Sequence, residues 1–186
     1  MMKKPLQYYI GNALMAFSFL LLVFIYYPLF ELYFFPQPIP KNAADYSFSI
    51  EIPRLHIFAP IIDNVDPFND ASYHEALTKG VALSRTGVEP GEKGTVYIFA
   101  HSSDFPWRIT HYNTIFYRIG ELQKGDSILI THNHHVYAYS VTSQKVVWPS
   151  EVDYITHTDT NQLILQTCTP IGTSFQRLLV FAIPRM

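Results

Sequence analysis

The sequence has only one cysteine, Cys168, among its 186 residues. A lone thiol cannot form a disulfide within the chain, so its presence requires another explanation. The sequence also lacks an excess of basic charge, with 13 Lys and Arg residues against 15 Asp and Glu residues. A basic surface is the electrostatic signature of nucleic-acid binding, and we therefore expect no nucleic-acid partner. We find no internal repeat and no low-complexity tract.

Charge is absent from one long stretch, which runs from Ile10 to Phe30. As a helix this stretch would be about 30 Å long, which matches the hydrocarbon core of a bilayer. Tyrosines stand towards both of its ends, where interfacial aromatic residues belong. We predict a short cytoplasmic N-terminus over residues 1–9 and a transmembrane anchor over residues 10–35. A cleaved signal peptide is the alternative, but its apolar region would be shorter, about 7–15 residues.

Basic residues predict the orientation of this anchor. Lys3 and Lys4 precede it, and no Lys or Arg follows before Lys41. The positive-inside rule then places the N-terminus in the cytoplasm and the rest of a single-pass protein on the other side. Alternating prolines follow the anchor, so residues 36–47 should form an extended and fairly stiff linker.

The remaining chain, residues 48–186, is rich in short β patterns. Val, Ile, Tyr, Phe and Thr recur in SFSIEI, IFAPII, TVYIFA, SILITH, VYAYSVTSQKVV, LILQTC and LLVFAI. Seven or eight such strands predict a mainly β domain, built as a closed or nearly closed antiparallel barrel. The segment NDASYHEAL should make a helical turn or two, capped by Asn69 or Ser72, and TIFYRIGEL a short helix or turn.

Three reactive or charged side chains stand at the ends of predicted strands. One apolar strand ends at His101, and another carries Cys168 to its tip. If the second strand forms a hairpin with Leu178–Ile183, Cys168 and Arg177 lie almost opposite each other, about 5 Å apart. A cysteine is often only a small buried residue, but these neighbours favour a catalytic nucleophile. The sequence alone does not place His101 beside the other two.

These residues lie in motifs that resemble the sortases, the membrane-anchored cysteine transpeptidases of bacterial cell surfaces. The T-C motif followed by an arginine matches Thr167, Cys168 and Arg177, and the strand-borne histidine matches Ala100–His101. Further similar stretches are IPRLHIFAPI, GVEPGEKGTVYIFAHSS and ELQKGDSILI, which occur in family order over about residues 48–183. The chain departs from the family at Ala100, where many members have glycine, and at Thr95, where Asn is frequent.

The resemblance implies a Cys–His–Arg site on an eight-stranded β-barrel. Cys168 would attack a peptide carbonyl as a thiolate, and Arg177 would favour the thiolate and stabilise the oxyanion. His101 would protonate the departing amine and accept a proton from the incoming one. The partners implied are secreted proteins with a C-terminal sorting signal and an amine acceptor on a cell-wall precursor or a pilin. The subclass looks nearer to classes D and E than to class A.

No metal or cofactor is expected. The tract from His132 to His135 could suggest a metal site, but its place between two strands favours a polar hairpin turn. Some sortases bind calcium with acidic residues, but here Glu89 and Glu92 flank a Pro-Gly turn that accounts for them.

Three other functions remain open from the sequence. One is an L,D-transpeptidase, a family that carries an S-x-G-C segment where this chain has Gln166 and Thr167 before Cys168. The others are a hydrolytic cysteine peptidase and a non-catalytic, membrane-anchored barrel that only binds peptides.

Overall fold

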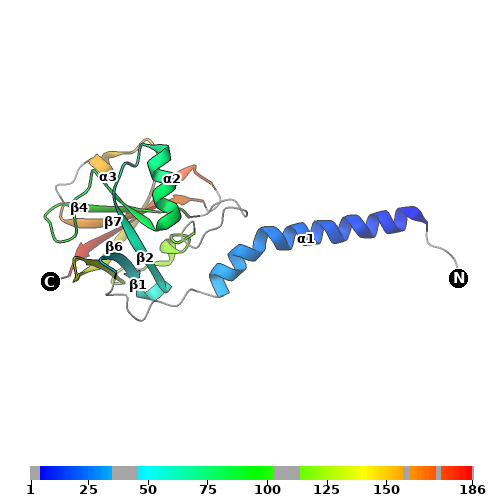
Figure 1. The fold of residues 1–186 in the computed structure, drawn as a ribbon, viewed down its shortest axis with the longest axis horizontal. Coiled ribbons are helices and arrows are strands. Elements are labelled where there is room, and N and C mark those ends of the chain that lie inside the picture. Colours follow the sequence, from blue (N-terminus) through cyan, green and yellow to red (C-terminus); the bar gives the residue numbers. More distant parts are fainter. Residues whose placement is uncertain (1–4, 35–45, 103–113, 157–159, 171–172, 186) are drawn as a thin grey trace. The chain divides into compact units, whose positions relative to one another are not determined.

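The structure is a computed structural model that describes residues 5–34, 46–102, 114–156, 160–170 and 173–185. Contacts divide the chain into two units, Met1–Pro36 and Gln37–Met186. Figure 1 shows the first as a single long helix and the second as a strand-rich body. The predicted linker, residues 36–47, lies almost wholly outside the described residues.

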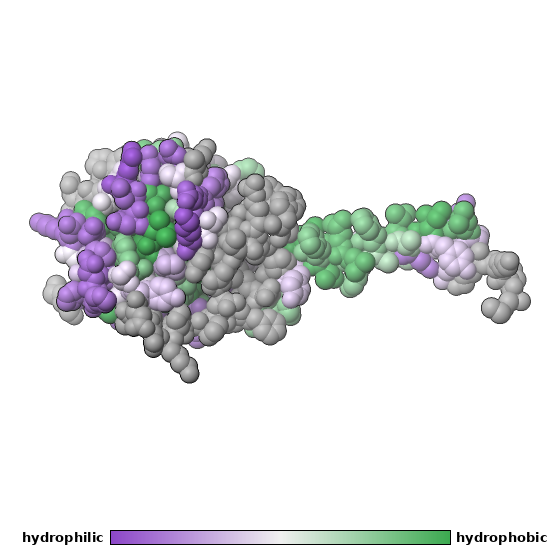
Figure 2. Space-filling view, viewed as in Figure 1, coloured by the Kyte–Doolittle hydropathy of each residue, from purple (hydrophilic) through white to green (hydrophobic). Residues whose placement is uncertain are grey.

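The helix of the first unit is α1, Leu6–Phe34. Its segment Leu6–Tyr27 has a mean hydropathy of 1.9 and is long and apolar enough to cross a membrane. These 22 residues span about 33 Å as a helix, close to the thickness of a bilayer's hydrocarbon core. Figure 2 shows the largely hydrophobic surface of this helix. The helix begins four residues before the predicted start of the anchor, and it fits a membrane anchor.

The described part of the second unit is a closed barrel in the strand order β1-β2-β3-β4-β7-β8-β6-β5. Figure 1 labels β1, β2, β4, β6 and β7 of this barrel. The strands are β1 Phe48–Ile52, β2 Ile57–Val65, β3 Val81–Ser84, β4 Thr95–Phe99, β5 Ser127–His132, β6 His135–Val147, β7 Gln162–Thr169 and β8 Gln176–Pro184. Short helical elements stand between them: η2 Pro53–Leu55, α2 Asp70–Lys79, η4 Ile119–Glu121 and α3 Asp153–Thr156. The prediction of a closed, mainly β barrel is confirmed.

Two of the strand pairings are parallel, which the prediction of an antiparallel barrel did not include. They join β2 to β3 and β4 to β7, while the other neighbouring strands pair antiparallel. Parallel neighbours need a long crossover. Helix α2 supplies it between β2 and β3, and β5 and β6 lie between β4 and β7 in the chain. Local alternation of residues cannot reveal such pairings, because it is the same for either direction.

Helix α2 is longer than the predicted turn or two, and of the two candidate caps Asn69 is the one used. The side-chain oxygen of Asn69 accepts the backbone N–H of Ser72 at 3.2 Å, which satisfies a donor that the first helical turn leaves open. The side chains of Ala76 and Leu77 are buried, so this side of the helix packs against the barrel. The predicted helix or turn in TIFYRIGEL consists of turns that end in η4.

Alternation along each strand divides the barrel residues between two faces. Side chains that point into the barrel form its core, and they include Ile50, Ile130, Ile98, Leu165 and Val180. The intervening residues of β4, β7 and β8 point outwards. On this outer face the ring of Tyr73, from α2, stacks on Phe99 with centroids 5.3 Å apart.

The predicted polar hairpin turn joins β5 to β6. Asn133 and His134 both have positive φ, 50° and 64°, between the paired residues His132 and His135. Two residues of positive φ make a turn whose twist suits a tight hairpin, and Asn tolerates that conformation well. The imidazole of His132 lies 3.8 Å from a Glu89 carboxylate oxygen.

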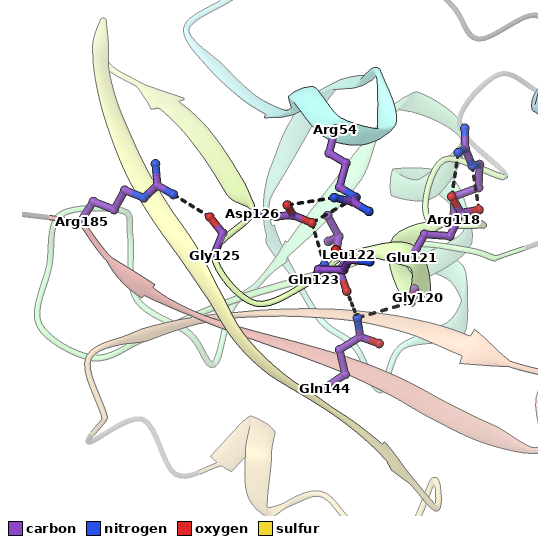
Figure 3. A network of polar contacts seen from close by, with 10 residues as sticks. All are labelled: Arg54, Arg118, Gly120, Glu121, Leu122, Gln123, Gly125, Asp126, Gln144 and Arg185. Carbon is purple, nitrogen blue, oxygen red and sulfur yellow. Dashed lines mark hydrogen bonds and ion pairs between the residues drawn. The ribbon is translucent and has the colours of Figure 1, made fainter.

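A second polar cluster surrounds the Gly125–Asp126 turn before β5 (Figure 3). The Asp126 carboxylate accepts the backbone N–H of Gln123 at 2.6 Å and pairs with the Arg54 guanidinium at 3.3 Å. Arg185, near the chain end, donates to the carbonyl of Gly125 at 2.7 Å. These contacts tie η2, the turn and the C-terminal segment together.

Candidate active site

Cys168 lies near the end of β7, directly opposite Arg177 of β8. Opposed residues of an antiparallel pair are about 5 Å apart and share one face of the sheet. The hairpin expected from the sequence is therefore present, and it brings the thiol and the guanidinium together. Both side chains are half-buried.

The parallel pairing of β4 with β7 brings His101 to the other side of Cys168. Phe99 pairs with Gln166, so two further steps in the same register put His101 across from Cys168. Two hydrogen bonds continue this pairing beyond the strand end. The Ala100 N–H donates to the Gln166 carbonyl at 3.1 Å, and the Thr167 hydroxyl donates to the Ala100 carbonyl at 3.0 Å.

His101, Cys168 and Arg177 thus form a row across three neighbouring strands, with the thiol in the middle. Adjacent strands are about 4.8 Å apart. The row stands on the outer face of the barrel, because alternation puts His101 on the same side as Phe99, which α2 covers. We call these three candidate catalytic residues the catalytic row. The sequence offered each member and the Cys168–Arg177 pair, but only the barrel's strand order adds His101 to them.

Helix α2 contributes two aromatic side chains that contact the imidazole of His101. The Tyr73 ring meets it edge-on at a centroid distance of 5.4 Å, and the His74 ring stacks on it at 5.8 Å. The carbonyl of His101 also accepts the backbone N–H of Phe116 at 3.3 Å. In the sequence, Tyr73 and His74 stand out only as parts of a predicted helical segment. No local signal marks them, because their contact with His101 depends on how α2 packs.

Burial and charge act in opposite directions on the Cys168 thiol. Burial raises its pKa, and the nearby Arg177 guanidinium lowers it, with burial the larger effect. The effect of Arg177 was expected from the sequence, whereas the burial of the thiol was not. The thiolate, which is the nucleophilic form, is therefore favoured towards alkaline pH.

Arg177 is held by carbonyl groups of its own segment. Its Nη1 donates to the carbonyls of Ser174 at 2.9 Å and of Gln176 at 3.2 Å. Within the described residues, its other guanidinium N–H groups make no hydrogen bond. A guanidinium has five N–H donors, so donors remain for an anion that forms beside Cys168.

The closed barrel and the catalytic row define a candidate cysteine-centred site for acyl transfer. The family model for the sortase domain matches residues 50–185, and the chain belongs to the sortase family. The three catalytic-row residues lie within the matched region. Membership of this family, and not of the L,D-transpeptidases, agrees with the motifs around Cys168.

Individual relatives carry the same family name. Sortase D of Bacillus subtilis (strain 168) is 26% identical over 136 residues, which are 71% of this chain and 60% of that protein. The chain therefore matches less than two thirds of this relative's length. The class of this relative is consistent with the expected nearness to classes D and E.

Solved sortase structures have the same fold. Sortase C-1 of Actinomyces oris is 26% identical with a TM-score of 0.62, over 75% of this chain and 73% of that one. The pilus-related sortase C of Group B Streptococcus is 26% identical with a TM-score of 0.63, over 76% of this chain and 68% of that one.

Proposed function

We propose that the protein is a sortase-type transpeptidase. It cleaves a peptide bond in a sorting signal through a thioester on Cys168 and transfers the acyl group to an amine. The observation that supports this best is the catalytic row, in which a half-buried thiol stands between a histidine and an arginine. Membership of the sortase family supports the same reaction.

The first half-reaction forms the acyl-enzyme. The Cys168 thiolate attacks the scissile carbonyl carbon, and the carbonyl oxygen becomes an oxyanion that accepts hydrogen bonds from Arg177. The intermediate collapses as the carbon–nitrogen bond breaks. The protonated His101 gives its proton to the departing amine, which leaves a thioester and a neutral imidazole.

The second half-reaction releases the product. An acceptor amine attacks the thioester carbonyl while neutral His101 takes a proton from the attacking nitrogen. The carbon–sulfur bond then breaks, a new amide forms, and the thiolate and the imidazolium are restored. In this scheme a hydrolytic peptidase differs only in using water in place of the amine.

The proposed partners follow from this chemistry and from the anchor. The donors are secreted proteins with a C-terminal sorting signal, and the acceptor is an amine of a cell-wall precursor or a pilin. A pilus-related relative supports a pilin as one possible acceptor. We place the chain in a bacterial cytoplasmic membrane with its N-terminus inside, because Lys3 and Lys4 precede α1.

The reaction uses no resident metal or cofactor in this proposal. Each step is carried by the thiol, the imidazole and the guanidinium. The acidic residues considered for calcium have protein partners, since a Glu92 carboxylate oxygen accepts the N–H of Glu89, and Glu89 lies beside His132.

The test is a screen of the full chain in detergent against a library of sorting peptides with several acceptor amines. Wild-type protein should form the transfer product and a covalent adduct visible by mass spectrometry. Cys168→Ala should abolish both, and Cys168→Ser should leave very little, because a hydroxyl does not ionise near neutral pH. Appreciable turnover by the alanine variant would overturn the proposal, and release of acid without amine transfer would favour a hydrolase.

A further inference from the structure

Gln166 is a polar side chain in an apolar part of the barrel's outer face. It is half-buried and lies two residues before Cys168, on the same side of β7. Its partners on the adjacent strands are Phe99 and Leu179, each only 1% exposed. A side-chain amide among such neighbours needs hydrogen-bond partners to offset the loss of water.

The phenol of Tyr97 satisfies one end of this amide. Tyr97 is 1% exposed, and its hydroxyl donates to Oε1 of Gln166 at 2.5 Å. Burial raises the pKa of Tyr97 far above the working range, although Arg177 opposes the effect, so the hydroxyl keeps its proton. A permanent donor on one side fixes which way the amide points.

The other end of the amide is open. With Oε1 held by Tyr97, the Nε2 of Gln166 points the other way, and it has no hydrogen-bond partner among the described residues. Nε2 carries two N–H donors. It therefore offers a pre-oriented donor on the strand that carries the thiol.

The spacing along β7 suggests what this donor binds. Gln166 and Cys168 are two residues apart, which is about 6.6 Å along a strand. A peptide bound in extended form has the same rise per residue, so its scissile carbonyl at Cys168 would bring a carbonyl two residues away close to Gln166. We propose that Gln166 donates a hydrogen bond to that main-chain carbonyl of the sorting peptide, with Tyr97 as the residue that positions the amide. This inference rests on the proposed transpeptidase function.

The experiment couples a change in the enzyme to a change in the peptide. The sorting peptide returned by the library screen is synthesised with a single thioamide, a weaker acceptor, at each carbonyl within three residues of the scissile bond. We measure kcat/KM for acylation by the full chain in detergent with each peptide. The variants are Gln166→Leu and Tyr97→Phe, and Tyr139→Phe is the control. Tyr139 is also a buried tyrosine, 3% exposed, but it pairs with Pro184 at the far end of β8.

Gln166→Leu should lower kcat/KM about tenfold, mainly through KM, because one hydrogen bond is lost. One peptide, with its thioamide two residues from the scissile bond, should lower the kcat/KM of wild type several-fold. The same peptide should cause no such loss in Gln166→Leu. Tyr97→Phe should lower kcat/KM roughly threefold, because the amide of Gln166 is then less well positioned, and Tyr139→Phe should have the kcat/KM of wild type. Alkylation of Cys168 by iodoacetamide should proceed within twofold of wild type in all variants, which reports an intact thiol site.

Equal thioamide losses in wild type and Gln166→Leu at every position would overturn the inference while leaving the transpeptidase function intact. The same holds if Tyr97→Phe and Tyr139→Phe behave alike. If Cys168→Ala turns over the same peptide, the proposed function fails, and this inference fails with it.

Discussion

Two polar regions of the described barrel, the cluster around Asp126 and the catalytic row, place their charged groups differently. Around Asp126 the charged groups are paired within the protein, since the carboxylate binds Arg54 and a backbone N–H (Figure 3). In the catalytic row, the pairing of β7 with β4 and β8 puts the thiol between His101 and Arg177. The first cluster holds chain segments together, and the second brings the candidate reactive groups side by side.

Arg118 and Arg177 differ in the kind of group that their guanidinium binds. Arg118 directs its Nε and Nη2 at one carboxylate, that of Glu121, at 2.9 and 2.7 Å (Figure 3). Arg177 instead uses Nη1 on two carbonyls of its own segment. A guanidinium already bound to a carboxylate has little left to offer a new anion, whereas one held by neutral carbonyls keeps both its charge and its donors. Of these two arginines, Arg177 is therefore the better candidate to bind a developing anion.

Among substitutions that leave Cys168 in place, the largest effect should come from replacing the guanidinium of Arg177. Arg177→Lys keeps the charge but loses the planar fork, so kcat/KM should fall by roughly 100- to 1,000-fold. The pH profile should keep its shape, since the substitution keeps a cation at this position. Full-length protein and amide substrates over a pH series test this. A profile that shifts with the substitution would show that Arg177 acts mainly on ionisation and not on the oxyanion.

His101→Ala should change the shape of the profile as well as its height. The reaction needs a thiolate, favoured at high pH because burial raises the pKa of Cys168, and a protonated imidazole, favoured at low pH. The kcat/KM of wild type should therefore have a bell-shaped dependence on pH. Without His101 the decline at alkaline pH should disappear, and the remaining rate should rise as the thiol ionises. An activated ester should rescue this variant more than Arg177→Lys; the opposite pattern would mean that the two roles are reversed.

A smaller effect is expected where α2 supports the row. Tyr73 contacts both Phe99 and His101, so Tyr73→Ala should lower kcat several-fold by loosening the imidazole, with a minor change in KM. Tyr73→Phe keeps the ring and should stay close to wild type. If the phenylalanine variant is as impaired as the alanine variant, the phenol and not the ring contact is what matters.

The Asp126 cluster should affect stability and leave chemistry alone. Asp126→Asn removes the ion pair with Arg54, whose side chain is 43% exposed, so it should lose less than about 1 kcal/mol, or a few degrees in Tm. The value of kcat/KM should remain within twofold of wild type. Thermal melting and a peptide assay on the same preparation check this. A large loss of activity at unchanged Tm would show that the Asp126 cluster also takes part in the reaction, against the difference drawn here between it and the catalytic row.

The smallest effect should follow removal of residues 1–45. The barrel has its own core and forms a separate contact unit, so the fragment should fold, stay soluble and react with iodoacetamide at the rate of the full chain. Circular dichroism on heating and alkylation kinetics measure both properties. An aggregate without a cooperative transition would argue against the domain boundary.

Local pattern in the sequence determined most of the fold and the identity of the candidate residues. Alternating apolar residues predict the strands, and an uncharged run predicts α1. Their positions at strand ends single out His101, Cys168 and Arg177. The Cys168–Arg177 pairing was also accessible, because a hairpin joins neighbouring segments of chain. These features depend on residues close together in the sequence, and periodicity reports them directly.

Only the tertiary structure decided how distant segments meet. The parallel pairing of β4 with β7 puts His101 beside Cys168, although 66 residues, positions 102–167, lie between them in the chain. Packing of α2 brings Tyr73 and His74 to His101, and burial sets the direction of the thiol pKa. Contact between Tyr97 and Gln166 arises in the same way. Strand order and burial are properties of the whole barrel, so no local stretch of sequence encodes them.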